Sequence, residues 1–322
     1  MPAPSSHSPS RRTSALSLFL LLLGVAVVAL QFCPLDEARH HPPHVETAST
    51  SQARASSLRI WTWNLNWLHH RDGAGLNKRD ALDYAALARY VRQIDADVVV
   101  VQEVDGEEAL RRIFDPGVYA FHVSSRDNVQ RVAIVYKRSL EVVRHPDVVA
   151  VARVYSERLR YGVDLGVRDP VSGEELRILG VHLKSGCFRS PLEGPYLDGE
   201  SEDACTKLRM QLPVLERWMK QRAEERSPFM LVGDFNRRFG HGESIWESWR
   251  WRMPELGLSS PTVKMRSQCW GGRYPEFIDH LVLDARAAKM MARRTTRQLL
   301  YEEQDAARHG YRLSDHCPVG FD

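Results

Sequence analysis

Acidic, amide and imidazole side chains recur at the carboxyl ends of the short apolar runs in this sequence. The residues at these positions are Asn64, Glu103, His182, Asp234, Asn236, Asp279, His280, Asp315 and His316. Loops that follow strands of a rigid scaffold commonly assemble binding and catalytic sites. Carboxylate and amide oxygens suit a hard divalent cation, and imidazoles suit proton transfer. No serine or cysteine stands in a recognisable nucleophile setting, so the set indicates metal-assisted hydrolysis of a phosphate ester.

The segments that must position these residues read mainly as strands. Short runs rich in Val and Ile include DVVVVQEV, RVAIVYK, LRILGVHLKS, FMLVGDFN and FIDHLVLD. A helix is predicted over 80–94, with an apolar face of Leu82, Ala86, Tyr90 and Ile94. A second helix is predicted over 203–226, bent or interrupted at Pro213. Because helices separate only some of the strands, the pattern favours packed sheets flanked by helices over a regular doubly wound fold.

Six motifs, in the order WNLNW, VQEV, GVHLKS, GDFN, IDHLVLD and SDHCPV, resemble those of the endonuclease/exonuclease/phosphatase superfamily. That superfamily includes pancreatic-type deoxyribonucleases, abasic-site endonucleases, neutral sphingomyelinases and inositol polyphosphate phosphatases. The resemblance spans about residues 60–321 and implies an α/β (α+β) fold, a four-layer sandwich of two mainly antiparallel β-sheets flanked by helices. It also implies a metal-dependent phosphodiester hydrolase that uses Mg²⁺, with Mn²⁺ or Ca²⁺ as alternative ions.

The resemblance implies a metal site and a general base. Glu103 matches the metal-binding Glu, Asn64 helps to position it, and Asp315 lies on the metal side. A single strong carboxylate ligand plus water is sufficient for Mg²⁺. His316 matches a terminal His that pairs with Asp279, and such a pair suits general-base activation of water.

The resemblance also implies groups that handle the phosphate. Asp234 and Asn236 match residues that orient the nucleophile and grip the phosphate, and His182 matches a His that protonates the leaving oxygen or binds phosphate. The abasic-site branch lacks a His at this position, so His182 argues against that branch. Gln130 stands where pancreatic-type enzymes have a Glu that partners this His, and a Gln cannot stabilise an imidazolium. His182 is therefore expected to bind phosphate more than to act as an acid.

The sequence allows two interpretations for the roles of several further side chains. Lys184, Arg237 and Arg238 are candidate phosphate contacts, although exposed, solvated charges are equally consistent with the sequence. The tryptophans Trp246, Trp249 and Trp251 are expected in the core, with a lid or stacking platform as the alternative.

The N-terminal segment indicates export. Arg11 and Arg12 precede an uncharged apolar run over 15–32, which is typical of a secretory signal peptide or an uncleaved membrane anchor. Residues 1–33 are assigned to this leader, 34–57 to a polar linker and 58–322 to one catalytic domain, expected to be a monomer. A periplasmic, secreted or membrane-anchored location follows from the leader.

Four cysteines beyond the leader allow three pairings, and an oxidising compartment favours disulfides. Cys187 and Cys205 bracket a loop rich in Gly, Pro and acidic residues, which favours a local disulfide; Cys269 with Cys317 then follows by elimination. A zinc site is the alternative, but the sequence has no close Cys-x-x-Cys pair among the four.

The formal net charge of +3 does not select a substrate. An exported nuclease acting on DNA or RNA is the leading hypothesis. A phospholipid phosphodiesterase of the sphingomyelinase type and a phosphomonoesterase are the alternatives, and the apolar leader makes a lipid substrate plausible. A catalytically silent binding module is disfavoured because the residues of the predicted site are all present.

Overall fold

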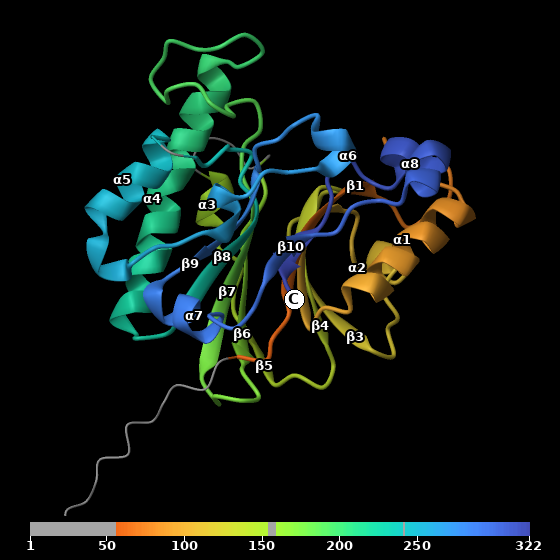
Figure 1. Ribbon diagram of the computed structural model, residues 1–322, viewed down its shortest axis with the longest axis horizontal. Coiled ribbons are helices and arrows are strands. Elements are labelled where there is room, and N and C mark those ends of the chain that lie inside the picture. Colours follow the sequence, from red (N-terminus) through yellow and green to blue (C-terminus); the bar gives the residue numbers. More distant parts are fainter. Residues whose placement is uncertain (1–55, 154–158, 241) are drawn as a thin grey trace, which may run out of the picture. The chain divides into compact units, whose positions relative to one another are not determined.

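Two β-sheets lie face to face at the centre of the fold (Figure 1). The computed structural model describes residues 56–153, 159–240 and 242–322. The first sheet has the strand order β10 (Thr296–Gln298), β11 (Val319–Phe321), β1 (Ile60–Leu68), β2 (Val98–Val104), β4 (Arg131–Lys137) and β3 (Tyr119–Val123). The second has the order β5 (Val142–Arg144), β6 (Val163–Arg168), β7 (Glu175–His182), β8 (Phe229–Asp234) and β9 (Asp279–Leu283). The β1–β2 and β7–β8 pairs are parallel and the other pairs within these sheets are antiparallel.

Helices cover the outer face of each sheet (Figure 1). On the first sheet, α1 (Ala81–Ile94) and α2 (Glu107–Leu110) share an apolar cluster with β1, β2 and β4. On the second, α4 (Glu202–Glu224) and α5 (Ser244–Arg252) share a cluster with β7 and β8. A third cluster fills the space between the sheets, where valines of β2 face residues of β6, β7 and β8. The four-layer sandwich predicted from the sequence is confirmed.

Short helices and turns complete the connections. They are α3 (Ala150–Arg153), η1 (Pro254–Leu256), η2 (Pro261–Lys264), α6 (Cys269–Gly272), α7 (Ala285–Met290), α8 (Glu303–His309) and η3 (Gly310–Arg312). Among the residues described, no helix is both long and apolar enough to cross a bilayer. The predicted leader (1–33) lies outside the described residues, as does the predicted linker up to residue 55.

Helix α1 begins directly after a capping residue, Asp80. The Asp80 side chain accepts hydrogen bonds from the backbone N–H groups of Leu82 and Asp83. The Asp83 side chain in turn accepts a hydrogen bond from the Asp80 N–H. These bonds satisfy backbone donors at the start of the helix that have no partner within it. Leu82 was expected on the buried face, but its side chain is 54% exposed. Ala86, Tyr90 and Ile94 are buried as predicted, and the buried face also includes Tyr84 and Leu87.

Helix α4 continues through Pro213, so the predicted interruption is absent. Pro213 is exposed, while Leu208, Leu212 and Leu215 bury the opposite side of the helix. Proline removes one backbone hydrogen bond in the middle of a helix, and burial of this apolar face offsets that cost.

Both predicted disulfides are present. Cys187 bonds Cys205 and Cys269 bonds Cys317, across 18 and 48 residues of chain respectively. Two disulfides suggest a protein of an oxidising, extracytoplasmic compartment. In helix α5, Trp246 and Trp249 are buried as expected, but Trp251 is 82% exposed, so its assignment to the core is wrong.

Candidate active site

Three ionisable side chains form a row across the second sheet. His182 ends β7 and pairs in parallel register with Asp234 at the end of β8, and Asp234 pairs in antiparallel register with Asp279 at the start of β9. Residues directly opposite on neighbouring strands project on the same face of a sheet. Strand pairing alone therefore brings together three of the residues that the motifs single out.

The first sheet contributes Asn64 and Glu103 from its adjacent strands β1 and β2. The Asn64 amide nitrogen lies 3.3 Å from Glu103 Oε1 and 3.1 Å from Asp234 Oδ2, so one side chain joins carboxylates of both sheets. The Asn64 amide oxygen accepts the Asn66 N–H at 3.0 Å. Asn64 thus orients Glu103 through donated hydrogen bonds. Burial raises the pKa of Glu103, against the opposing hydrogen bond from Asn64.

His316 joins the row from the loop before β11. Its Nδ1 lies 2.7 Å from Asp279 Oδ2, and its Nε2 lies 3.9 Å from Asp234 Oδ2. Ser314 fixes this loop, because its hydroxyl donates to the Asn64 carbonyl at 2.7 Å and accepts the His316 N–H at 3.0 Å. Burial acts to lower the pKa of His316, but the charge and hydrogen bond of Asp279, together with the charge of Asp234, raise it well above its ordinary value.

Asp234 is a buried carboxyl between these groups. Burial, then the charge of Asp279, raise the pKa of Asp234 to about 7, although the Asn236 N–H donates to its Oδ1 at 2.7 Å. Asn236 itself has a positive φ of 51°, and its amide nitrogen donates to the Leu183 carbonyl at 3.2 Å. Asp234 can therefore exchange a proton near neutral pH.

His182 is buried with its Nε2 3.5 Å from Asp234 Oδ2 and 3.7 Å from Glu103 Oε1. Burial, then the positive charges of Arg160 and His316, lower the pKa of His182 well below its ordinary value. Its Nδ1 has no hydrogen-bond partner within the described part of the chain. Gln130 lines the same cavity. A neutral imidazole is suited to donate a hydrogen bond rather than to carry a positive charge, which supports the phosphate-binding expectation.

Arg160 is a residue of this site that the motifs do not reveal. It is 7% exposed, lines the cavity and donates a hydrogen bond to the Leu183 carbonyl. Burial lowers the pKa of Arg160 to about 10, although the charges of Asp234 and Glu103 act to raise it, so the group stays a cation at neutral pH. In sequence, Arg160 stands among other arginines before β6 and outside every recognised block, so only folding places it beside the carboxylates.

These residues open onto a cavity of about 420 Å³. Its lining includes Asn64, Glu103, Gln130, Arg160, His182, Asp234, Asn236, Asp279, Asp315 and His316. Asp315 is exposed at its edge. The lining also includes four aromatic residues, referred to below as the aromatic wall: Phe188, Trp270, Tyr274 and Phe277. Cys269 and Cys317 also line this wall, so a disulfide joins it to the residue after His316.

Two predicted phosphate contacts lie elsewhere. Arg237 is 1% exposed, forms an ion pair with Glu243 at 2.7 Å and donates to the Ser190 carbonyl at 2.7 Å. It anchors the loop closed by Cys187 and Cys205, so its assignment as a phosphate contact is wrong. Lys184 is absent from the cavity lining and its Nζ donates to the Ser185 carbonyl.

His280, the neighbour of Asp279, is fully buried behind the row. It stacks on Phe239 with ring centroids 4.2 Å apart. Its Nε2 lies 2.9 Å from the Arg237 carbonyl and its Nδ1 lies 2.7 Å from Thr262 Oγ1. These partners are consistent with a neutral ring that carries its proton on Nε2. Burial lowers the pKa of His280 to about 4.

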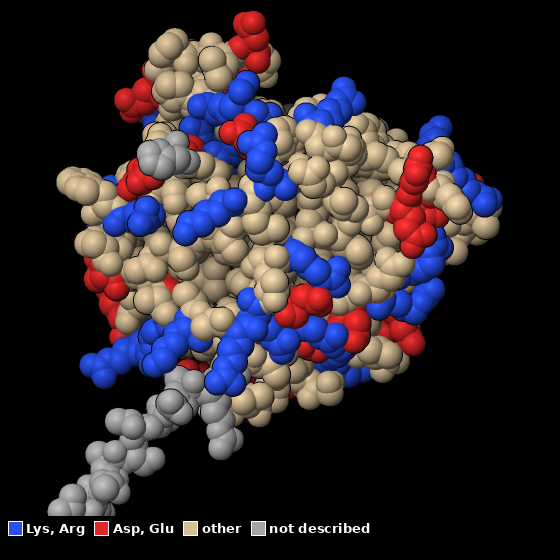
Figure 2. All heavy atoms as spheres, in the orientation of Figure 1, with Lys and Arg blue, Asp and Glu red and all other residues tan. Residues whose placement is uncertain are grey.

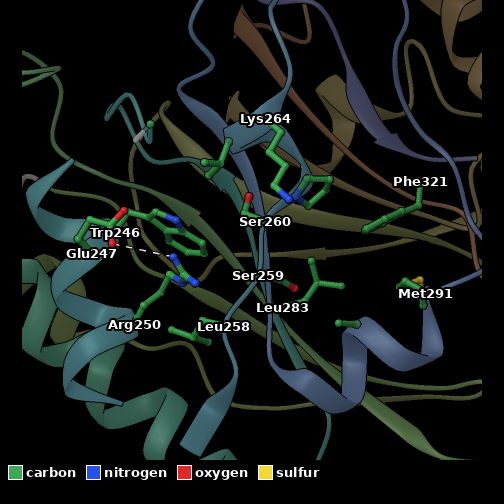
Figure 3. Close-up of a pocket in the computed structure, with 14 residues that line it drawn as sticks. Trp246, Glu247, Arg250, Leu258, Ser259, Ser260, Lys264, Leu283, Met291 and Phe321 are labelled. Atoms are coloured by element: carbon green, nitrogen blue, oxygen red, sulfur yellow. Dashed lines mark ion pairs between the residues drawn. The ribbon is translucent and has the colours of Figure 1, made fainter. Parts of the chain in front are cut away.

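A second cavity, of about 520 Å³, has a different character (Figure 3). Its walls are largely apolar and include Trp246, Leu258, Leu283 and Met291. The single carboxylate in its lining, Glu247, pairs with Arg250 at 3.9 Å, as the dashed line marks. None of the predicted site residues lines it, so the candidate active site is the smaller cavity.

The smaller cavity fits a divalent cation. Glu103, Asp234 and Asp279 supply carboxylate oxygens there, and suitable atoms of Asp234, Asp279 and His316 lie within 4.8 Å of one another. Asp279 Oδ1 has no hydrogen-bond partner among the residues described. Buried carboxylates that outnumber their cationic partners are the donor set that hard cations prefer.

The family model for the endonuclease/exonuclease/phosphatase family matches residues 61–316. The chain belongs to this family. Its members are hydrolytic phosphoesterases that generally depend on a divalent metal. The family assignment made from the six motifs is thus confirmed, and so is phosphoester hydrolysis as the class of reaction.

Solved structures show the same fold at low sequence identity. The catalytic domain of human Nocturnin, solved with a bound sulfate anion, aligns with a TM-score of 0.54 at 15% identity, covering 82% of this chain and 93% of that one. TDP2 from Caenorhabditis elegans aligns with a TM-score of 0.52 at 16% identity, covering 82% and 74%. A mannosyl-6-phosphatase from Bacteroides thetaiotaomicron aligns with a TM-score of 0.51 at 15% identity, covering 83% and 99%. No curated protein matches the sequence.

Proposed function

We propose that this phosphoesterase is an exported, Mg²⁺-dependent nuclease that hydrolyses phosphodiester bonds of DNA or RNA. The observation that carries the proposal is the convergence of the His316–Asp279 pair, Asp234 and Glu103 on one cavity. Attack of water on a phosphate ester requires groups that take up the proton of the water and a cation that stabilises the phosphate. The base, the oriented imidazole and the metal-binding carboxylate of this cavity suit these tasks.

Glu103 is the proposed principal ligand of the ion, with Asn64 holding its carboxylate in place. The exposed Asp315 would complete the oxygen donors on that side of the cavity. When bound, the ion supplies Lewis-acid stabilisation of the charge that develops on the phosphate oxygens. Mn²⁺ or Ca²⁺ would serve as the alternative hard cation.

Asp234 and His316 are the groups proposed to bind the attacking water and to take up its proton. Asp234 can accept this proton at neutral pH, since its pKa is raised to about 7. Asp279 holds His316 with Nε2 turned toward Asp234, and the raised pKa of His316 keeps a proton on the ring. In this proposal Asp234 acts as the base, next to the protonated His316. The hypothesis from the sequence assigned general-base activation of water to the His316–Asp279 pair alone.

Arg160, His182 and Asn236 are the proposed phosphate-binding groups. Arg160 supplies a buried guanidinium, and such donors recognise phosphate oxygens in a planar, bidentate manner. His182 adds a neutral hydrogen-bond donor next to Glu103, and Asn236 lines the cavity at the end of β8. Gln130 replaces the carboxylate that would favour a charged His182.

A nucleic acid is favoured over the alternative substrates by the aromatic wall. Phe188, Trp270, Tyr274 and Phe277 line the same cavity as the carboxylates, and Tyr274 is 56% exposed. Aromatic side chains beside a phosphate site stack on unpaired bases. Lys and Arg side chains are interspersed with Asp and Glu on the face shown in Figure 2. Recognition is therefore proposed to rest on the cavity more than on a broad basic surface.

The test is a substrate panel for the purified full-length protein. Plasmid DNA, RNA, sphingomyelin and mannose 6-phosphate would each be assayed with Mg²⁺ and with chelator. Cleavage of a nucleic acid that stops with chelator would support the proposal. Preferential turnover of sphingomyelin or of the phosphomonoester would replace nuclease activity with that activity. No turnover of any substrate would favour a binding module.

A further inference from the structure

A cluster of two histidines and one aspartate lies outside the candidate active site, at the ends of β1 and β2. His69 and His70 follow directly after β1, and Asp105 follows directly after β2. The Asp105 N–H donates to the Leu68 carbonyl at 2.9 Å, which brings the two chain segments together. His69 Nε2 and His70 Nδ1 lie 3.2 Å and 2.6 Å from the same atom, Asp105 Oδ2.

We propose that His69, His70 and Asp105 form a Zn²⁺-binding site that is distinct from the ion site at Glu103. Two imidazoles and one carboxylate are donors that Zn²⁺ and its late first-row neighbours favour, whereas Mg²⁺ prefers oxygen ligands. All three donor atoms lie within 4.8 Å of one another. None of these three residues lines the active-site cavity.

Binding of an ion requires the two imidazole rings to turn, because His69 and His70 are stacked with ring centroids 4.4 Å apart. Donors around a tetrahedral zinc ion, each about 2.0–2.1 Å from the metal, are separated by roughly 3.3–3.4 Å. The His69–Asp105 distance of 3.2 Å is already close to this range. The His70–Asp105 distance of 2.6 Å is a hydrogen bond that must lengthen as the shared proton leaves.

The main chain that carries both histidines is held in place by other residues. The Tyr84 hydroxyl donates to the His69 carbonyl at 2.7 Å, and Arg112 Nη1 donates to the His70 carbonyl at 2.8 Å. The Arg112 guanidinium also stacks over the Tyr84 ring at 3.7 Å. Fixed backbones reduce the loss of conformational entropy when side chains close on an ion.

One contact must change when the ion binds. The Arg71 N–H donates to His69 Nδ1 at 3.1 Å, which leaves the ring proton on Nε2, facing Asp105. Ligation through Nε2 shifts this proton to Nδ1, so the contact with the Arg71 N–H has to open. Arg71 is exposed in a bend, where such a shift is inexpensive. The Arg71 amide is therefore a local reporter of metal binding.

A small cavity leaves room for a further ligand of the ion. Its volume is about 180 Å³, and its lining includes Trp67, His69, Leu76, Asp105 and Val129. Water can occupy the fourth position there. Because the ligands come from the loops after β1 and β2, the ion would tie together the two strands that carry Asn64 and Glu103.

The test uses Co²⁺ alone as a spectroscopic substitute for Zn²⁺ on chelator-treated full-length protein. The double variant E103A/D234A serves as the background, since it removes two carboxylates of the active-site cavity, including the proposed ligand Glu103. One equivalent of Co²⁺ is expected to produce the intense visible absorption of a tetrahedral site and to shift the Arg71 amide resonance. His70→Gln and the double variant H69A/H70A should bind Co²⁺ about 100-fold more weakly or worse.

His145→Ala is the matched control. His145 is also partly exposed, with Nε2 3.8 Å from a carboxylate, Glu175, but belongs to no cluster of three donors within the described residues. It should bind Co²⁺ like the background protein. Circular dichroism of each ion-free variant reports whether it is folded. Equal Co²⁺ binding by folded H69A/H70A, or no visible band in the background protein, would overturn the proposal.

Discussion

His316 Nδ1 lies 2.7 Å from Asp279 Oδ2, although the two residues are separated by the whole segment between β9 and the last loop. The pair fixes the orientation of the ring, and its Nε2 faces Asp234 across 3.9 Å. The orientation of His316 therefore depends on one carboxylate, Asp279, which is also the largest contributor to its raised pKa. This dependence can be tested without disturbing the metal-binding carboxylate Glu103.

Asp279→Asn is expected to lower kcat for phosphodiester hydrolysis by about 10³-fold, because an amide holds the ring less firmly and removes the charge that keeps it protonated. Kinetics at saturating substrate would measure the loss. His309→Gln is the matched control, since His309 forms a buried pair with Asp83, also at 2.7 Å, outside the cavity. It should alter stability but leave kcat within about threefold. Retention of normal kcat in Asp279→Asn would remove the assigned role.

Glu103→Gln should weaken the response of activity to Mg²⁺, because the variant loses the charge of the proposed principal ligand. Titration of activity against Mg²⁺ would show an apparent metal affinity weaker by about 100-fold. Glu276→Gln provides a comparison, because Glu276 lines the same cavity but pairs with Arg238 at 3.2 Å. An unchanged Mg²⁺ titration in Glu103→Gln would place the ion elsewhere.

Arg160→Met is predicted to reduce kcat/KM by about 100-fold, through loss of a buried donor to the phosphate. Inorganic phosphate should also inhibit this variant less strongly than the native enzyme. Arg168→Met, which removes an exposed arginine of β6 paired with Glu141, should change neither quantity. Native phosphate inhibition in Arg160→Met would assign Arg160 a purely structural role.

Removal of the Cys269–Cys317 disulfide by serine substitution should impair both stability and activity. Chain entropy gives a loss of about 4 kcal/mol for the longer closed loop and about 3 kcal/mol for that of Cys187–Cys205. Only the first variant is expected to lower kcat markedly, because Cys317 directly follows His316. Denaturant unfolding and kinetics on both double variants would test this. A larger kcat loss in the Cys187–Cys205 variant would contradict it.

His280 should make the protein less stable in acid. Its pKa is lowered by burial from an ordinary 6.5 to about 4, so below pH 6.5 the unfolded chain binds a proton that the folded chain excludes. Stability is therefore retained above about pH 6.5 and falls by about 3 kcal/mol as the pH approaches 4. Urea unfolding across this range should show a shallower slope with pH in His280→Gln. The same slope in both proteins would show that His280 does not contribute.

The motif residues could be predicted because each lies on or beside a strand, within a contiguous run of recognisable sequence. Strand register then brings His182, Asp234 and Asp279 into one row without further information. Arg160 could not be found in this way, since its position beside Glu103 and Asp234 arises only from folding. Nothing in the local sequence distinguishes it from its neighbouring arginines.

The direction in which a side chain points could not be predicted from the sequence. Arg237 follows GDFN directly, which suggested a phosphate contact, but its guanidinium turns toward Glu243 and backbone carbonyls of the Cys187–Cys205 loop. Similarly, Leu82 and Trp251 have apolar side chains in helices yet face outward. Apolar spacing predicts that a helix forms, but the tertiary contacts decide which of its faces is buried.

The aromatic wall and the row of His182, Asp234 and Asp279 are held by different parts of the fold. The row belongs to the hydrogen-bonded backbone of β7, β8 and β9, whereas the wall belongs largely to the segment between Cys269 and β9, attached at Cys269 to the last loop. A protein engineer can therefore exchange residues 271–276 while leaving the strands and the hydrogen bond from Trp270 to the Ser314 carbonyl intact. Replacement loops of similar length would alter which molecule is held against the phosphate site and would leave the hydrolytic groups where they are.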